Sequence, residues 1–137
     1  MPNKIAQFKT HSKRLAVAFV QRGSLQAANE LRAILGPQGG KRTGVVYTKG
    51  KNGTIKHQAS APGESPAPDT GRLRQSATHE TVRVEGDKVI GGAGVSAPYA
   101  AALEFGTETI EPRPFMSRLL TEPHKGNINR AAQGALK

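Results

Sequence analysis

The first 35 residues carry a helical repeat of apolar side chains, and this repeat limits the fold more than any other sequence feature. Gly23 and Ser24 interrupt the repeat, and serine favours a helix N-cap. Gly36 and Pro37 are typical of a helix end. The pattern predicts one long helix, kinked or broken at Gly23, with its apolar face on the core and a basic outer face. The repeat comprises Ile5, Phe8, Ser12, Leu15 and Phe19, then Leu25, Ala28, Leu31 and Leu35.

The remainder predicts short elements joined by turns, and therefore an α+β fold. Asn52 and Gly53 favour a hairpin. We expect the long helix to pack on a small antiparallel or mixed sheet with two or three short helices, while the hairpin and a Pro-rich loop protrude. The expected elements are the hairpin 45–57, the extended loop 59–71, helices 71–79, 99–105 and 114–122, and strands 81–85 and 88–90. One domain covers residues 1–123, and residues 124–137 form a flexible tail.

Composition indicates a thin core. Only 36% of the 137 residues are hydrophobic, and the chain has 16 glycines and nine prolines. Part of its stability is therefore expected to come from partner subunits. The chain has no cysteine, which excludes disulfides and thiolate metal sites. No apolar run approaches the length that spans a bilayer, so no membrane association is expected.

Positive charge is concentrated in the first 60 residues. They hold eleven lysines and arginines and one acid, Glu30, whereas residues 61–137 hold nine of each sign. Such a segment favours phosphate, anionic lipid or an acidic protein face. Aromatic residues for base stacking are scarce there, so any DNA contact would be independent of sequence. The candidate basic patch is Lys4, Lys9, Lys13, Arg14, Lys41, Arg42, Lys49 and Lys51.

Three motifs offer chemical interpretations, and none supports catalysis. Residues 36–43 approximate a phosphate loop, but the spacing is one residue short and Arg42 intervenes. Residues 92–97 match a dinucleotide fingerprint, yet the second parallel strand that such a site needs is missing. The acids Glu104, Glu108 and Glu111 suit either a metal or acid–base site, or a solvated or inter-subunit charged patch. We expect no cofactor, no metal and no enzymatic activity.

Two stretches carry a family resemblance. One is residues 60–76, where prolines lead into Asp69-Thr70-Gly71; the other is residues 99–107, ending Glu-Phe-Gly-Thr, followed by Arg-Pro-Phe at 113–115. Together they resemble the tail-completion, or head–tail joining, family of long-tailed phages. This is the gene-product-ten-like family of lambdoid phages, related to lambda minor tail protein Z. The resemblance covers residues 1–123.

The resemblance implies a structural virion protein without enzymatic activity. It implies a homo-oligomeric ring in the neck or upper tail, reached after assembly in the host cytoplasm. Its neighbours would be head-closure proteins and tail-tube or tail-terminator proteins, with non-specific contact to passing DNA. The alternative is a sequence-independent DNA-binding protein that uses the basic N-terminal half.

Candidate site residues fall into an assembly set and a packing set. A loop stiffened by proline loses less entropy on docking, so the Pro-rich loop is expected to reach a neighbour. Arg113 precedes a proline, is held extended and can reach Glu104 or another subunit. The assembly candidates are Pro62, Glu64, Pro66, Pro68, Asp69, Glu104 and Arg113. The core and turn candidates are Tyr99, Phe105, Gly106, Pro114 and Phe115.

Overall fold

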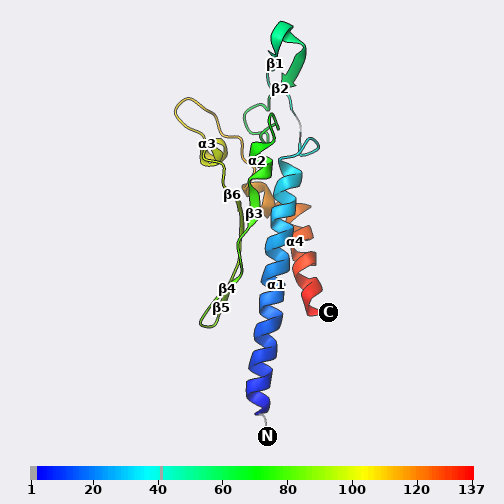
Figure 1. Cartoon of the computed structure of the whole chain (residues 1–137), viewed down its shortest axis with the longest axis vertical. Helices are drawn as coiled ribbons and strands as arrows, with labels where there is room; N and C mark the ends of the chain where they lie inside the picture. The colour runs from blue at the N-terminus through cyan, green and yellow to red at the C-terminus, as the bar shows by residue number, and fades with distance from the viewer. Residues whose placement is uncertain (1–2, 41) are drawn as a thin grey trace.

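A single long helix forms the axis of the molecule, and shorter elements pack along its C-terminal part (Figure 1). The computed structural model describes residues 3–40 and 42–137. Helix α1 (Lys4–Ile34) has 31 residues. Helix α4 (His124–Gln133) runs beside it, and the strands form antiparallel pairs, so the expected α+β class is confirmed.

Helix α1 begins at an Asn3 cap, whose side-chain oxygen accepts a hydrogen bond from the Ile5 N–H at 3.0 Å. The expected break at Gly23 is wrong, because the helix continues through it. Ser24 caps nothing; its hydroxyl donates to the Val20 carbonyl at 2.8 Å. Gly23 instead faces α4, where a Cβ would lie 3.4 Å from that of Ala132, an ordinary contact distance.

The first turns of α1 are not packed on the core, contrary to the expectation for this helix. All residues from 3 to 14 are exposed, and we call this segment the N-terminal overhang. Ile5 and Phe8 are 65% and 71% exposed. These turns are exposed because the helix extends beyond every element packed against it (Figure 1). The buried residues of α1 begin at Ser24.

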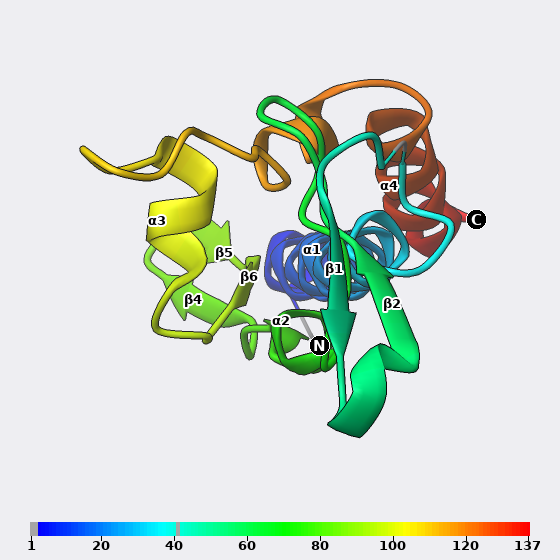
Figure 2. The same cartoon turned by 90° about the horizontal axis from the view of Figure 1, so that it is seen from above.

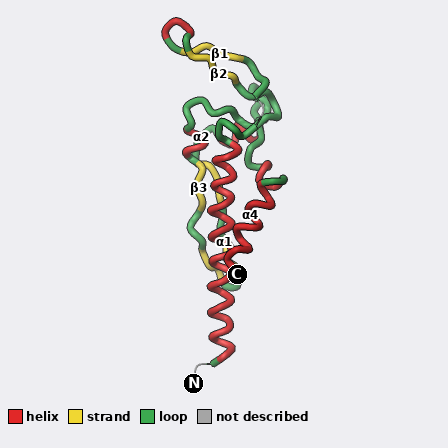
Figure 3. The backbone as a smooth tube through the Cα atoms, turned by 90° about the vertical axis from the view of Figure 1, so that its right-hand side faces the viewer, coloured by secondary structure: helices red, strands yellow, loops and turns green. Residues whose placement is uncertain are grey.

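Within the described residues, the strands form three separate two-stranded antiparallel ladders rather than one sheet. The expected hairpin exists as β1 (Val46–Lys49) and β2 (Ile55–Gln58), joined through the short 3₁₀ turn η1 (Lys51–Gly53). It stands clear at one end of the molecule (Figure 3). The other pairs are β3 (Ala77–His79) with β6 (Ala93–Val95), and β4 (Arg83–Glu85) with β5 (Lys88–Ile90).

Two expectations about this region are corrected. The helix predicted over 71–79 is the short α2 (Arg72–Gln75), and the chain then enters β3. Residues 93–95, inside the dinucleotide-like motif, form strand β6, which pairs antiparallel with β3. The fingerprint needs a strand-to-helix turn in a parallel unit, so this segment has the wrong geometry for it.

The core lies where the end of α1 meets α2, β3, α3 (Ala100–Phe105) and the chain around residue 115. Phe115 is fully buried against Leu31, Ile34 and Leu35, which confirms it as a core residue. Phe105 was expected there too and is 79% exposed. It is the last residue of α3, two positions beyond the inward-facing Leu103, so helical rotation turns it outward.

The packing of other expected anchors varies. Tyr99 precedes α3 and is 41% exposed, so it is not a core residue. Pro114 is half-buried. The helix predicted over 114–122 is wrong: an extended segment leads into a single 3₁₀ turn, η2 (Ser117–Leu120).

The segment expected as a flexible tail is helical. Residues 124–133 form α4, and a final turn η3 (Gly134–Leu136) follows. Both contact α1. Small side chains make this packing close, with Ala132 buried opposite Gly23. The domain therefore includes residues 124–136.

Gly91, directly after β5, lies close against α1. A Cβ on Gly91 would lie 2.6 Å from the Ser24 hydroxyl and 2.7 Å from Val20 Cγ1. We expect Gly91→Ala to lower the free energy of unfolding by about 1–3 kcal/mol through overpacking. Gly92→Ala is the matched control, because its nearest neighbour would be 3.8 Å away. Equal urea midpoints for the two variants would contradict the close packing.

Candidate assembly surfaces

Hydrogen bonds connect the two motifs of residues 104–107 and 113–115 in the structure. The Glu104 carboxylate accepts hydrogen bonds from the backbone N–H groups of Phe115, Met116 and Ser117 at 2.7, 2.9 and 3.1 Å. Burial favours a raised pKa for Glu104, but these donors outweigh it and lower the pKa. Glu104 is therefore an internal brace, not the free interface residue that the sequence suggested.

Between the two motifs the chain forms a projecting loop. The Arg113 N–H donates to the Leu103 carbonyl at 2.6 Å, and the Thr107 N–H donates to the Ile110 carbonyl at 2.8 Å. Gly106 is confirmed as a turn residue: its φ is +75°, and a Cβ would lie 2.8 Å from the Ile110 oxygen. Seen from above, α3 and this loop project to one side of α1, with α4 on the other (Figure 2).

The projecting loop combines exposed apolar and acidic side chains. We call residues 105–111 the acidic loop. Phe105 is 79% exposed and Ile110 39%. Glu108 and Glu111 are also exposed, and no ion pair within residues 3–40 and 42–137 involves either. The loop is therefore a candidate contact surface with a defined chemistry.

Arg113 does not meet Glu104. Its Nε donates to the Ser60 carbonyl at 3.3 Å, which ties it to the Pro-rich loop of its own chain. Arg118 makes a second tie, from its guanidinium to the Gly63 carbonyl at 2.9 Å. The side chain of Arg113 thus serves intramolecular packing.

The Pro-rich loop is held to the body more firmly than expected. The Glu64 carboxylate accepts from the Thr43 N–H and hydroxyl at 3.0 and 2.6 Å, and from the Ala61 N–H at 2.8 Å. Pro66 is buried, Pro68 is half-buried, and Pro62 is exposed. Of the three prolines proposed for docking, only Pro62 is fully available.

A cleft beside this loop unites several of the predicted site residues. It has a volume of about 340 Å³. Its walls come from the Pro-rich loop, the base of the hairpin, α2 and α3. The predicted site residues in its lining are Pro66, Pro68, Asp69, Tyr99 and Arg113. The cleft does not include Glu64, Glu104 or Pro62.

An ion pair between Lys49 and Asp69 connects the hairpin to the Pro-rich loop. The hydrogen bond from Lys49 lowers the pKa of the Asp69 carboxyl. Apolar side chains on the hairpin remain exposed: Val45, Val46, Tyr47 and Ile55. An isolated two-stranded hairpin is marginally stable in water, so this surface also suits a contact with another subunit.

The basic residues do not form one patch. Lys4, Lys9, Lys13 and Arg14 lie on the overhang, and Lys51 lies at the far end of the molecule in the hairpin turn. Arg42 donates to the Gly36 carbonyl at 2.7 Å, in the turn that follows α1. Lys49 is paired with Asp69. Lys41 lies outside the described residues.

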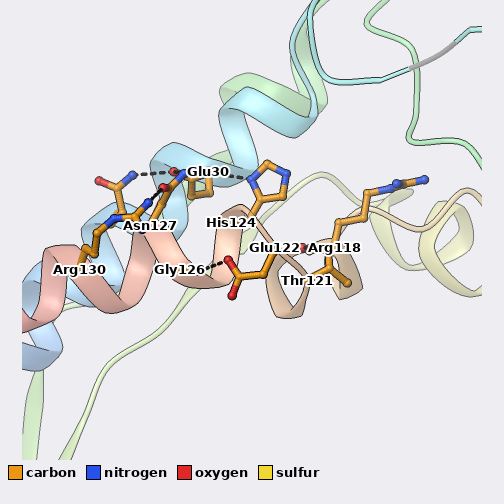
Figure 4. Close-up of polar contacts among 9 residues, drawn as sticks. Glu30, Arg118, Thr121, Glu122, His124, Gly126, Asn127 and Arg130 are labelled. Carbon is orange, nitrogen blue, oxygen red and sulfur yellow. Dashed lines mark hydrogen bonds and ion pairs between the residues drawn. The ribbon is translucent and has the colours of Figure 1, made fainter.

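A buried polar cluster clamps α4 to α1 (Figure 4). Glu30 is 7% exposed. Its carboxylate lies 2.6 Å from His124 Nδ1 and accepts from the side chains of Gln26 at 2.7 Å and Asn127 at 3.2 Å. Sequence reasoning missed this cluster. Its one available signal was Glu30, the single acid among the first 60 residues.

The clamp gives stability a dependence on pH. Burial favours a raised pKa for Glu30, but the three hydrogen bonds outweigh it and hold the pKa below its ordinary value of 4.5. Its stabilisation is therefore complete above pH 4.5 and is lost as pH falls through the lowered pKa. Below pH 4.5, we expect the melting temperature of Glu30→Gln to fall less steeply with pH than that of the wild type. Glu111→Gln removes an exposed carboxylate as a control, and identical pH profiles for both variants would contradict the clamp.

Other classes of site find no support in the described part of the chain. Residues 3–40 and 42–137 contain no group of three or more histidines, cysteines or acids placed to hold a metal. No helix among these residues is both long and apolar enough to cross a bilayer. Comparison with models of known families gives no match, and neither curated proteins nor solved structures show significant similarity to the chain.

Proposed function

We propose that this chain is a non-enzymatic structural protein of a long-tailed phage particle, joining head and tail as part of a homo-oligomeric ring in the neck or upper tail. Its neighbours are head-closure proteins on one side and tail-tube or tail-terminator proteins on the other. The protein gathers in the host cytoplasm and ends in the virion. The proposal starts from the resemblance of residues 60–76, 99–107 and 113–115 to tail-completion proteins.

The observation that carries the proposal is the placement of exposed apolar side chains at three separated projections. These are the overhang, the hairpin and the acidic loop. Exposed apolar patches mark interaction sites. A protein in a ring needs contacts with copies on both sides and with layers above and below, and three separated surfaces suit that requirement better than one cleft does.

A second observation supports the resemblance. Its two most specific motifs are separated by one loop, and Glu104 of the first accepts a hydrogen bond from the backbone N–H of Phe115 in the second. The pair therefore acts as one structural unit that presents the acidic loop. This gives a physical reason for the glutamate at position 104.

An amber mutation in the gene tests the proposal. Without suppression, we expect lysates with separate DNA-filled heads and complete tails in electron micrographs, and a restored titre when the wild-type chain is supplied in trans. An amber mutation elsewhere in an unrelated non-structural gene is the control. Normal joined particles in the absence of the chain would contradict the proposal.

DNA binding is a second candidate, favoured by four basic side chains on the overhang that have no ion-pair partner within residues 3–40 and 42–137. Each duplex phosphate contacted contributes about −0.9 to the slope of log K against log salt. Because the basic residues are divided between separate ends of the molecule, we expect a slope shallower than about −3. A steep slope with sub-micromolar affinity at physiological salt would favour the DNA-binding function instead.

A further inference from the structure

The face of α1 that α4 covers continues uncovered along the overhang. Helical periodicity places Phe8 and Phe19 on the same face as Gly23, where Ala132 of α4 makes its close contact. Helix α4 ends partway along α1 (Figure 1). Beyond that end, Ile5 and Phe8 extend the apolar seam into solvent. The exposed side chains of this seam can therefore be buried by another segment, as α4 buries the same face further along the helix.

The charge around this seam restricts its partner. Lys4, Lys9 and Lys13 flank the apolar stripe, and residues 3–29 contain no acid at all. Two overhangs packed on each other would bring these like charges together, which is unfavourable. The occupant is therefore an acidic segment with apolar side chains of its own.

The chain contains such a segment in the acidic loop. Residues 99–112 hold three acids and no lysine or arginine. Glu104 is used as the internal brace, so Glu108 and Glu111 remain beside the exposed Phe105 and Ile110. The overhang and the acidic loop lie toward opposite ends of the molecule, so they do not meet within one chain (Figure 1).

We propose that the overhang of one copy packs on the acidic loop of the next copy. Ile5 and Phe8 bury Phe105 and Ile110, while Lys9 and Lys13 pair with Glu108 and Glu111. The two surfaces differ, so the contact is heterologous and repeats from copy to copy, closing a ring when the rotation between copies allows it. The inference rests on the proposed function, because it names the contact that builds the proposed ring.

Cross-linking tests the contact directly, because the chain has no cysteine of its own. Phe8→Cys and Ile110→Cys are made as separate proteins and mixed under mild oxidation. We expect the mixture to form disulfide-linked dimers at least about tenfold faster than either protein alone, since the contact raises the effective concentration of the two thiols. Phe8→Cys mixed with Ile55→Cys, on the hairpin, is the control pair.

Two results would overturn the inference. Faster dimerisation of Phe8→Cys alone would show that overhangs pair with each other. A rate for the Phe8 and Ile110 pair equal to that of the hairpin control would show that these surfaces do not meet.

Charge reversal provides an independent test. Sedimentation measures self-association of the variants, after nuclease treatment to remove bound nucleic acid. We expect Lys9→Glu with Lys13→Glu, and separately Glu108→Lys with Glu111→Lys, each to weaken self-association at least about tenfold, and the combination of all four to restore it. Reversal of Lys51 and Lys56 on the hairpin is the control. Unchanged association in both double variants, with melting temperatures like the wild type, would contradict the contact.

The same variants separate this inference from the proposed function. Normal joined particles from the amber mutant, together with preferential cross-linking of the two thiols, would leave the ring contact standing and remove the head–tail role. Particles that depend on the chain but show no preferential cross-linking would leave the head–tail role standing and remove this contact.

Discussion

Replacing Phe115 with alanine is expected to lower the free energy of unfolding by about 3–5 kcal/mol. Phe115 is fully buried and contacts the end of α1, where Leu31 and Ile34 have almost no exposed surface. Its removal leaves a cavity that the surrounding helices cannot fill. Urea unfolding followed by circular dichroism measures the change.

Phe105→Ala is the matched control, because it removes the same side chain from a position that is 79% exposed. We expect a change within about 0.5 kcal/mol, typical of surface substitutions. The two phenylalanines are ten residues apart and both lie in the resemblance motifs. Equal destabilisation by the two substitutions would contradict the division into core and contact residues.

Removing residues 124–137 is expected to cost at least about 3 kcal/mol of stability. Glu30 loses its hydrogen bonds to His124 and Asn127, and bonds to a charged group contribute about 1.5–3 kcal/mol each. The face around Gly23 also loses the cover of α4. Calorimetry of the truncated and complete chains measures the loss.

Removal of Leu136 and Lys137 alone is the control for that truncation. Leu136 is 56% exposed, so its loss is expected to change the melting temperature little. Unaltered stability in the longer truncation would mean that residues 124–137 behave as the flexible tail that the sequence suggested.

Local patterns predicted the elements that local interactions determine. The periodicity of α1, the turn at Gly106 and the hairpin around Asn52 and Gly53 each depend on residues close in sequence, and the structure contains all three. Asn52 has a φ of +74°, as a tight hairpin turn requires. Phe115 was also correctly predicted as a core residue.

Pairings distant in sequence were not predictable from such patterns. Glu30 and His124 are 94 residues apart, and nothing local indicates that a histidine in a small polar segment completes a helix contact. The orientation of Phe105 depends on where α3 ends, which periodicity over six residues cannot specify. Arg42 was assigned to a basic patch by composition, whereas its guanidinium is hydrogen-bonded to the Gly36 carbonyl in the turn after α1.

The proposed location of the chain at the neck of a phage particle can be tested most directly by labelling it there. A hexahistidine tag after Lys137 can be labelled with nickel-coated gold on purified particles and located by electron microscopy. We expect the gold at the junction of head and tail, at one place in each particle. Particles that lack the chain, or gold distributed along the tail or over the head, would contradict it.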